Sequence, residues 1–292
     1  MRRLDVRLIC LWLVIAGVCI VPSAFAAGLA EPVGANAVTL RHAQMVYPTV
    51  LVSLAGPSGS GTVIYSAQRD GEWHSYVLTN HHVIARNIDI SEQWDPQAGK
   101  NRRVETRTPL ELKWYTYNEL SKPIGNSAKR ARIVAWTKDH DLALLRIADT
   151  ERGVDHVAHL LPQDEPLHLT ERVWAVGAGL GRPPFATSGH VSLVDDVLDG
   201  LTWTLASAPI IFGNSGGGLF RWSECRHRYE LVGVPSRVAV AGFATVVESM
   251  GIAIPMERVY GFLERNCYGP IVALDLPDTC ESLGEVKKEA EK

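Results

Sequence analysis

A serine flanked by glycines is the residue best suited to do chemistry in this 292-residue chain. Residues 212–220 read FGNSGGGLF, with Ser215 at the centre. Glycine adopts backbone angles that other residues avoid, and it lets a second main chain approach closely. A serine hydroxyl beside free backbone N–H groups suits acyl transfer, because the hydroxyl attacks a carbonyl and the N–H groups hold the negative oxygen that develops. The segment alone fits a glycine-rich turn with a solvated serine equally well.

A nucleophilic serine needs a base, usually a histidine that a carboxylate orients. Of the ten histidines only His227 follows Ser215. The serine–acid–histidine order of a nucleophile elbow would therefore confine Ser215, Glu224 and His227 to thirteen residues, which is too little chain for three separate loops. The sequence excludes this order.

The opposite order has good candidates. Residues 76–84 (YVLTNHHVI) predict a strand that runs into a polar turn with His81 and His82. Residues 139–147 (DHDLALLRI) place Asp141 at the start of a short apolar strand. A partly buried carboxylate at such a position needs a hydrogen-bond donor such as an imidazole N–H.

Five segments together resemble trypsin-like serine peptidases, most closely the bacterial HtrA/Deg-type protease domain without a PDZ domain. The segments TNHHV (79–83), DLALL (141–145) and GNSGG (213–217) are similar to the three catalytic motifs of that family. The segments TSGHVS (187–192) and GIAIP (251–255) resemble the hairpin that opens its second barrel and the strand that closes it.

This resemblance implies a role for each matching residue. His82 would be the general base, Asp141 the acid that orients it, and Ser215 the nucleophile. The N–H groups of Gly213 and Ser215 would form the oxyanion hole. His81 would take the role of base only if the motif were shifted by one residue.

Two positions depart from the family pattern. Phe212 stands where the HtrA branch usually has proline, and Asn214 stands where the digestive enzymes have an aspartate that pairs with a freed N-terminus. Activation by insertion of an N-terminus is therefore not expected. The resemblance implies an exported serine endopeptidase that acts on protein or peptide substrates through an acyl-enzyme, without metal or cofactor. A catalytically silent peptide-binding pseudoprotease and an esterase with the same site are the alternatives.

The resemblance also locates a specificity pocket, walled by residues 209–212 and 234–237. Pro209 stands where the enzyme that cuts after Lys or Arg has an aspartate, and no acidic residue occurs between positions 201 and 222. We therefore expect cleavage after small or medium apolar residues, unless Arg237 points inward and recruits an acidic one. The candidate substrate-binding residues are Ile210, Ile211, Phe212 and Ser236.

Residues 1–26 have the features of a signal peptide. Three arginines precede an apolar run of about fourteen residues, which is shorter than the ~20 of a membrane span, and AFA (24–26) fits a cleavage site. An uncleaved anchor is the alternative. Cleavage would change the net charge from −3 to −5, and this acidic balance argues against nucleic-acid binding. We expect an exported, periplasmic or secreted protein without a stable membrane span; its oligomeric state stays open.

The remaining chain predicts an all-β fold of two antiparallel six-stranded β-barrels with a C-terminal helix. We expect a lead-in at 27–46, a peptidase domain at 47–268 and a C-terminal tail at 269–292. Barrel one would span about 47–150, with a polar surface loop at 87–108, and barrel two about 170–265. The predicted strands lie at 47–54, 61–66, 73–79, 110–117, 131–137, 142–148, 172–176, 190–194, 201–207, 217–222, 230–234 and 251–255, and the helix at 256–266.

Two further features of the sequence are its cysteines and a second glycine-rich segment. Removal of residues 1–26 leaves Cys225, Cys267 and Cys280, and an oxidising compartment favours one disulfide among them, whose pairing stays open. The glycine-rich segment 177–181 lacks the last glycine of a dinucleotide-binding loop and is followed by two prolines. We expect it to be a flexible loop near the cleft.

Overall fold

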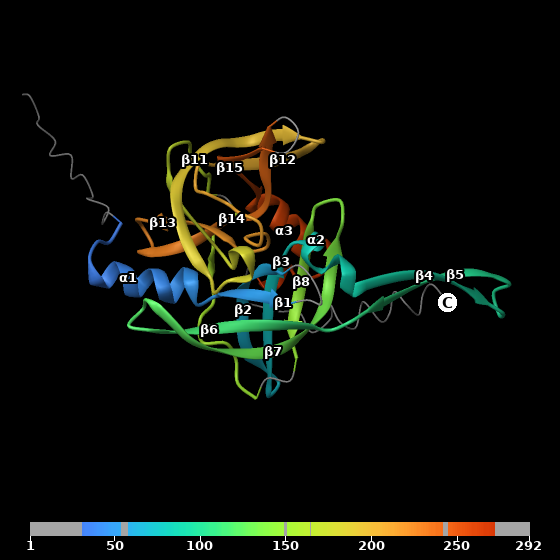
Figure 1. Ribbon diagram of the computed structural model, residues 1–292. Coiled ribbons are helices and arrows are strands. Elements are labelled where there is room, and N and C mark those ends of the chain that lie inside the picture. The colour runs from blue at the N-terminus through green and yellow to red at the C-terminus, as the bar shows by residue number, and fades with distance from the viewer. Residues whose placement is uncertain (1–30, 54–57, 149–150, 164, 242–244, 272–292) are drawn as a thin grey trace, which may run out of the picture.

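The computed structural model describes residues 31–53, 58–148, 151–163, 165–241 and 245–271. The predicted signal peptide, Cys280 and most of the tail lie outside these residues. The predicted all-β fold with a C-terminal helix is confirmed, and the two groups of strands lie one above the other (Figure 1).

The first group of strands closes into a six-stranded antiparallel barrel. Valines and leucines alternate toward its interior, as on Val50, Val52, Val63 and Val77, so one face of each strand fills the core. The barrel order is β1 (Thr49–Ser53), β2 (Gly59–Arg69), β3 (Glu72–Thr79), β8 (Leu142–Ile147), β7 (Lys122–Thr137) and β6 (Leu110–Asn118), and β6 pairs with β1.

The second group forms a seven-stranded sheet whose first and sixth strands also pair, which makes a ring of six. The ring order is β13 (Gly218–Ser223), β10 (Arg172–Gly177), β11 (Phe185–Leu198), β12 (Leu201–Ala206), β15 (Thr245–Pro255) and β14 (Arg228–Ala241), and the short β9 (His159–Leu160) joins β14 in parallel. Helix α3 (Met256–Arg265) follows and buries Val259, Phe262 and Leu263, as its spacing predicts.

One hydrophobic core joins the two barrels. Tyr76 and Leu144 of barrel one belong to the same buried cluster as Val173 and Phe220 of barrel two. This shared core fixes the two barrels relative to each other, and so it fixes the loops that meet between them.

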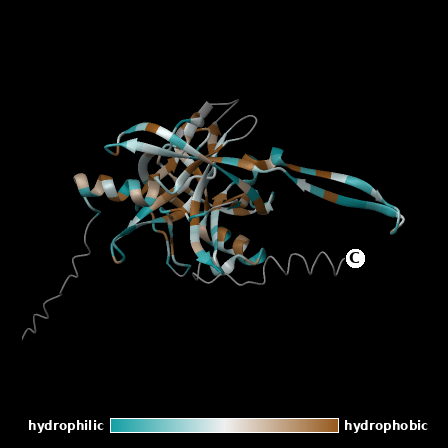
Figure 2. Cartoon of the chain, turned by 90° about the horizontal axis from the view of Figure 1, so that it is seen from below, coloured by the Kyte–Doolittle hydropathy of each residue, from teal (hydrophilic) through white to brown (hydrophobic). Residues whose placement is uncertain are grey.

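The prediction of a loop at 87–108 is wrong. After α2 (His81–Ile84) and a 3₁₀ turn (Ala85–Asn87), the chain forms a two-stranded ribbon of β4 (Ile88–Asp95) and β5 (Lys100–Arg107). The ribbon reaches away from both barrels, and its residues are mostly hydrophilic (Figures 1 and 2). At its base Arg107 donates hydrogen bonds to the carbonyls of Ile133 and Val134.

The predicted lead-in also has regular structure, namely α1 (Ala35–Arg41) and a π-helical turn (His42–Val46). Glu31 accepts hydrogen bonds from Arg41, Trp174 and the Tyr229 hydroxyl, and these bonds tie the segment to barrel two. Within the described residues, no helix has the length and apolar character that crossing a membrane requires.

Candidate active site

Asp141 and His82 lie close together where the C-terminal end of β3 meets the N-terminal end of β8. The imidazole Nδ1 of His82 lies 2.8 and 3.0 Å from the two carboxylate oxygens of Asp141, and the backbone N–H of His82 donates to the same carboxylate at 2.9 Å. An ionised carboxylate only accepts hydrogen bonds, so this contact places the imidazole proton on Nδ1. The other ring nitrogen, Nε2, then carries a lone pair and can accept a proton.

Ser236 contributes a further hydrogen bond to Asp141. Its hydroxyl donates to the carboxylate at 2.6 Å. Burial by itself would raise the pKa of Asp141, but the hydrogen bond and charge of His82, together with the Ser236 hydrogen bond, outweigh burial and hold this pKa below its ordinary value. Asp141 is therefore ionised at neutral pH.

The neighbouring histidine has a different environment. The His81 ring stacks on Trp136 at a centroid distance of 5.0 Å, and burial lowers the pKa of His81. The side chain of Asn80, the residue before His81, donates a hydrogen bond to the backbone carbonyl of Asp141 at 2.9 Å. Of the two adjacent histidines, it is His82 that contacts the carboxylate.

Ser215 lies on the loop between β12 and β13, close to Ser236 of β14. Its hydroxyl donates to the main-chain carbonyl of Ser236 at 3.3 Å. Ser236 thus contacts Ser215 through its carbonyl and Asp141 through its hydroxyl. The sequence placed Ser236 near a specificity pocket, and its contact with Asp141 was missed because nothing in the local sequence reports a partner 95 residues away.

Two peptide groups next to Ser215 are held in place by hydrogen bonds that their carbonyl oxygens accept. The Phe212 carbonyl accepts from the Leu180 N–H at 2.8 Å, and the Asn214 carbonyl accepts from the Gly217 N–H at 2.9 Å. A trans peptide points its N–H opposite to its C=O, so the N–H groups of Gly213 and Ser215 point away from these partners. Neither N–H has a hydrogen-bond acceptor among the described residues, which leaves both available as donors.

Ser60 of barrel one makes hydrogen bonds that hold the loop of Ser215 in place. Its hydroxyl donates to the Gly213 carbonyl at 2.6 Å and accepts from the Ala178 N–H at 2.7 Å, and its own N–H donates to the Ser215 carbonyl at 2.8 Å. The segment around Gly177–Gly181, predicted to be a flexible loop, forms a 3₁₀ turn that packs against the nucleophile loop. Two carbonyls that flank the candidate oxyanion hole are therefore fixed by the other barrel.

Two glycines of the loop meet a strict steric requirement. Gly213 has a φ of +98° and Gly216 a φ of +83°, in the region that favours glycine. A Cβ on Gly216 would lie 2.2 Å from the Ser60 carbonyl oxygen, and one on Gly213 would lie 2.7 Å from the Leu180 nitrogen. The close packing of the loop thus depends on glycine at both positions.

The candidate substrate-binding residues occupy different environments. Ile210 is buried in the shared core, Ile211 is partly exposed, and the Phe212 side chain is 67% exposed. The Arg237 guanidinium pairs with Asp199 at 3.0 Å and lies over the Trp203 ring. Its charge is therefore already paired with Asp199 and packed against the buried Trp203 ring.

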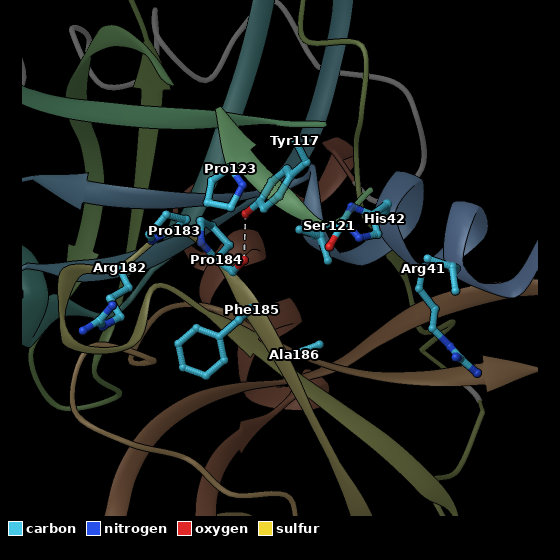
Figure 3. Close-up of a pocket in the computed structure, with 12 residues that line it drawn as sticks. Arg41, His42, Tyr117, Ser121, Pro123, Arg182, Pro183, Pro184, Phe185 and Ala186 are labelled. Atoms are coloured by element: carbon cyan, nitrogen blue, oxygen red, sulfur yellow. Dashed lines mark hydrogen bonds between the residues drawn. The ribbon is translucent and has the colours of Figure 1, made fainter. Parts of the chain in front are cut away.

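A hollow of about 410 Å³ lies between α1, the β6–β7 hairpin and residues 182–186, and it contains none of the three candidate catalytic residues (Figure 3). The Tyr117 hydroxyl crosses it to donate to the Pro184 carbonyl at 2.7 Å (Figure 3). Over the described ranges, no group of three or more potential metal ligands comes together. Cys225 and Cys267, the two cysteines within those ranges, are both free thiols.

Comparison with known proteins gives a consistent result. The family described as trypsin-like peptidase domain matches residues 59–234. Curated proteins give no match. Among solved structures, the chain is similar to a serine endoprotease from Yersinia pestis, with 21% identity and a TM-score of 0.53 over 83% of this chain and 68% of that one. It is also similar to the HtrA-type protease AlgW with a tripeptide, with 19% identity and a TM-score of 0.53 over 80% of this chain and 63% of that one. The chain thus spans about two thirds of the length of these structures.

Proposed function

Since the chain belongs to the trypsin-like peptidase family, we propose that it is an exported serine endopeptidase that uses His82, Asp141 and Ser215. The observation that carries the proposal is the shared position of Ser236, whose hydroxyl contacts the Asp141 carboxylate and whose carbonyl contacts the Ser215 hydroxyl. Ser236 thus links Ser215 to the pair of Asp141 and His82, which supports a common site for the three candidate catalytic side chains.

The chemistry begins when the Ser215 hydroxyl turns from Ser236 to Nε2 of His82. Nε2 takes the hydroxyl proton while Oγ forms a bond to the substrate carbonyl carbon, and the carbonyl electron pair moves onto oxygen. The N–H groups of Gly213 and Ser215 stabilise that oxygen, and Asp141 stabilises the imidazolium. Collapse breaks the C–N bond, and His82 returns the proton to the leaving amine.

The second half of the reaction repeats these steps with water. His82 takes a proton from the water molecule, whose oxygen attacks the ester carbonyl of the acyl-enzyme. Collapse then breaks the bond to Oγ, and the proton returns to Ser215. Side chains carry the proton transfers and backbone N–H groups stabilise the oxyanion in each step as written.

Strand β14 supports substrate binding in an extended conformation. From Arg237 to Ala241 it pairs with β15 on one edge, whereas its pairing with β13 ends at Gly233. Among the described strand pairings the second edge beyond Pro235 has no partner, so an extended peptide can add to it as a strand. Such a peptide would pass directly beside Ser236 and Ser215.

The proposed specificity is for small or medium apolar residues before the cleaved bond. Arg237 pairs with Asp199 and lies over the Trp203 ring, so its charge is not needed to pair with a substrate. A buried cationic side chain without a partner would cost several kcal/mol, whereas an apolar one would gain about 1.5–3 kcal/mol. A profile of cleavage sites in denatured proteins tests this, and dominant cleavage after Lys or Arg would contradict it.

Labelling with a fluorophosphonate tests the enzyme itself, since the reagent reacts with an activated serine. The wild type should label and digest casein, Ser215→Ala should do neither, and His82→Ala should lose on the order of 10⁴-fold in rate. His81→Ala is the matched control and should keep most activity. A wild type that stays unlabelled would favour the pseudoprotease, and one that cleaves only an ester substrate would favour the esterase.

A further inference from the structure

Arg258 is a buried cation close to the candidate triad, and the proposed reaction does not use it. It lies in the first turn of α3, is 8% exposed, and packs with its guanidinium carbon 4.5 Å from the centre of the Trp203 ring. Within the described part of the chain, no carboxylate lies at ion-pair distance from it. A buried charge is costly without compensation, so its contacts indicate what it contributes.

The guanidinium holds two backbone carbonyls. One terminal nitrogen donates to Thr202 at 2.9 Å, and the other donates to His140 at 3.0 Å. The His140 carbonyl belongs to the peptide group that joins His140 to Asp141. The N–H of the same peptide group donates to the Lys138 carbonyl at 3.1 Å, so both sides of this planar unit are held.

This restraint matters because Asp141 has an uncommon backbone conformation. Its φ is +53°, in the left-handed region, which costs free energy for a residue other than glycine. Such a conformation persists only where neighbouring contacts enforce it. A small rotation of the peptide before Asp141 would move the carboxylate away from His82.

We propose that Arg258 is a positioning residue that fixes the peptide before Asp141 and thereby holds the Asp141 carboxylate against His82. This inference rests on the proposed function, in which Asp141 orients the general base His82. The charge also matters. Burial foremost, and then Arg237, lower the pKa of Arg258 to about 10, while the charge of Asp141 raises it, so the guanidinium stays protonated at neutral pH without a direct ion pair to that carboxylate.

The test compares Arg258→Met with Arg221→Met. Arg221 is an equally buried arginine that pairs with Glu165 and Glu171 at the other side of barrel two, so its loss should destabilise the fold without moving Asp141. For Arg258→Met we expect kcat to fall about 10–100-fold with KM unchanged, because small displacements of catalytic groups cost that much. Arg221→Met should lower Tm and keep kcat. Arg258→Lys should recover part of the loss, since lysine still reaches one carbonyl.

A second readout does not depend on turnover. In the Ser215→Ala background, the proton between His82 Nδ1 and Asp141 should give a downfield NMR signal, and Arg258→Met should shift or broaden it whereas Arg221→Met should not. If the wild type neither labels nor cleaves, the proposed function fails while this signal still tests the role of Arg258. An unchanged signal, or a kcat loss equal in the two methionine variants, would overturn the inference. If Arg258→Met does not fold, Arg258→Lys against Arg221→Lys decides by the same criteria.

Discussion

Ser60 shows how a residue outside the candidate triad can determine its chemistry. It belongs to barrel one, is fully buried, and makes three hydrogen bonds to the loops of barrel two on either side of the candidate oxyanion hole. Removal of the hydroxyl leaves the half-buried Gly213 carbonyl and the buried Ala178 N–H without this partner. Each unsatisfied group costs about 1–3 kcal/mol, and the loop can lower this cost by turning its peptides.

Ser60→Ala should therefore lower kcat about 10–100-fold and leave KM nearly unchanged, because 1.36 kcal/mol corresponds to a factor of ten in rate. The affinity for a peptide boronic acid, which forms a tetrahedral adduct with the serine, should fall by a similar factor. Ser66→Ala is the matched control. Ser66 lies on the same strand, pairs with Ser75 and accepts from the Val154 N–H, far from the loop. Equal losses in both variants would show that general destabilisation is the cause.

The hydrogen bond from Ser236 to Asp141 should make stability depend on pH in a defined direction. The pKa of Asp141 is depressed in the folded protein, so this carboxylate contributes stability above the unfolded pKa of about 3.9, and the contribution is lost as pH falls through the folded pKa. Ser236→Ala moves the folded pKa back up. We expect it to cost about 1–2 kcal/mol at pH 7 and progressively less as the pH falls below about 3.9.

Urea unfolding of the wild type and Ser236→Ala between pH 7 and 3 measures this difference. Thr49→Val serves as a control, because the Thr49 hydroxyl donates to the Met45 carbonyl and no ionised group takes part. Its cost should stay constant with pH. A Ser236→Ala cost that is independent of pH would show that the hydroxyl does not stabilise the charged carboxylate.

At the scale of elements, local patterns predicted the strands that face a core, because Val and Leu at alternating positions report which face is buried. The ribbon of β4 and β5 was missed for the same reason. Ile88 at its base packs against the core of barrel one, but farther out Ile90 and Val104 stand among charged residues, and the segment has the composition of a loop. The helical lead-in at Ala35–Val46 was missed because one face of small and mixed side chains buries only Ala37, Met45 and Val46.

The ribbon should be the least protected β-structure in hydrogen exchange. A two-stranded ribbon outside a sheet is marginally stable in water, and Trp94 near its turn is 63% exposed. We expect amides of Ser91–Arg103 to exchange orders of magnitude faster than those of β3 and β8. Replacement of residues 91–104 by a short turn should leave Tm nearly unchanged, provided that Glu105 and Arg107 keep their contacts with Trp136 and the β7 carbonyls. Slow exchange along the whole ribbon would contradict this picture.

At the scale of the molecule, the shared core implies that the two barrels unfold together. Leu144 lies in barrel one but is fully buried in the cluster that includes the core of barrel two. Leu144→Ala should cost about 2–5 kcal/mol and lower the protection of amides in both barrels equally. Val52→Ala, in the cluster confined to barrel one, should do the same if unfolding is a single transition. Loss of protection in barrel one alone would show two separate units.

The three motifs were found from the sequence, because each carries reactive residue types in a local pattern. The long-range contacts that hold them were not, since nothing in the local sequence around Ser60, Ser236 and Arg258 reports those contacts. Their contacts reach across 153, 95 and 118 positions respectively. Only the folded arrangement brings such residues together.

The support that Ser60 gives to the nucleophile loop has a consequence for when activity can arise during biogenesis. The hydroxyl that holds Gly213 comes from the first barrel, and the loop it holds comes from the second, so a partly folded chain contains all three reactive side chains without the anion-binding N–H groups in place. Docking of the two halves is then itself the activating step. Under the proposed function, chains that are still being synthesised would then have no peptidase activity until both barrels have folded.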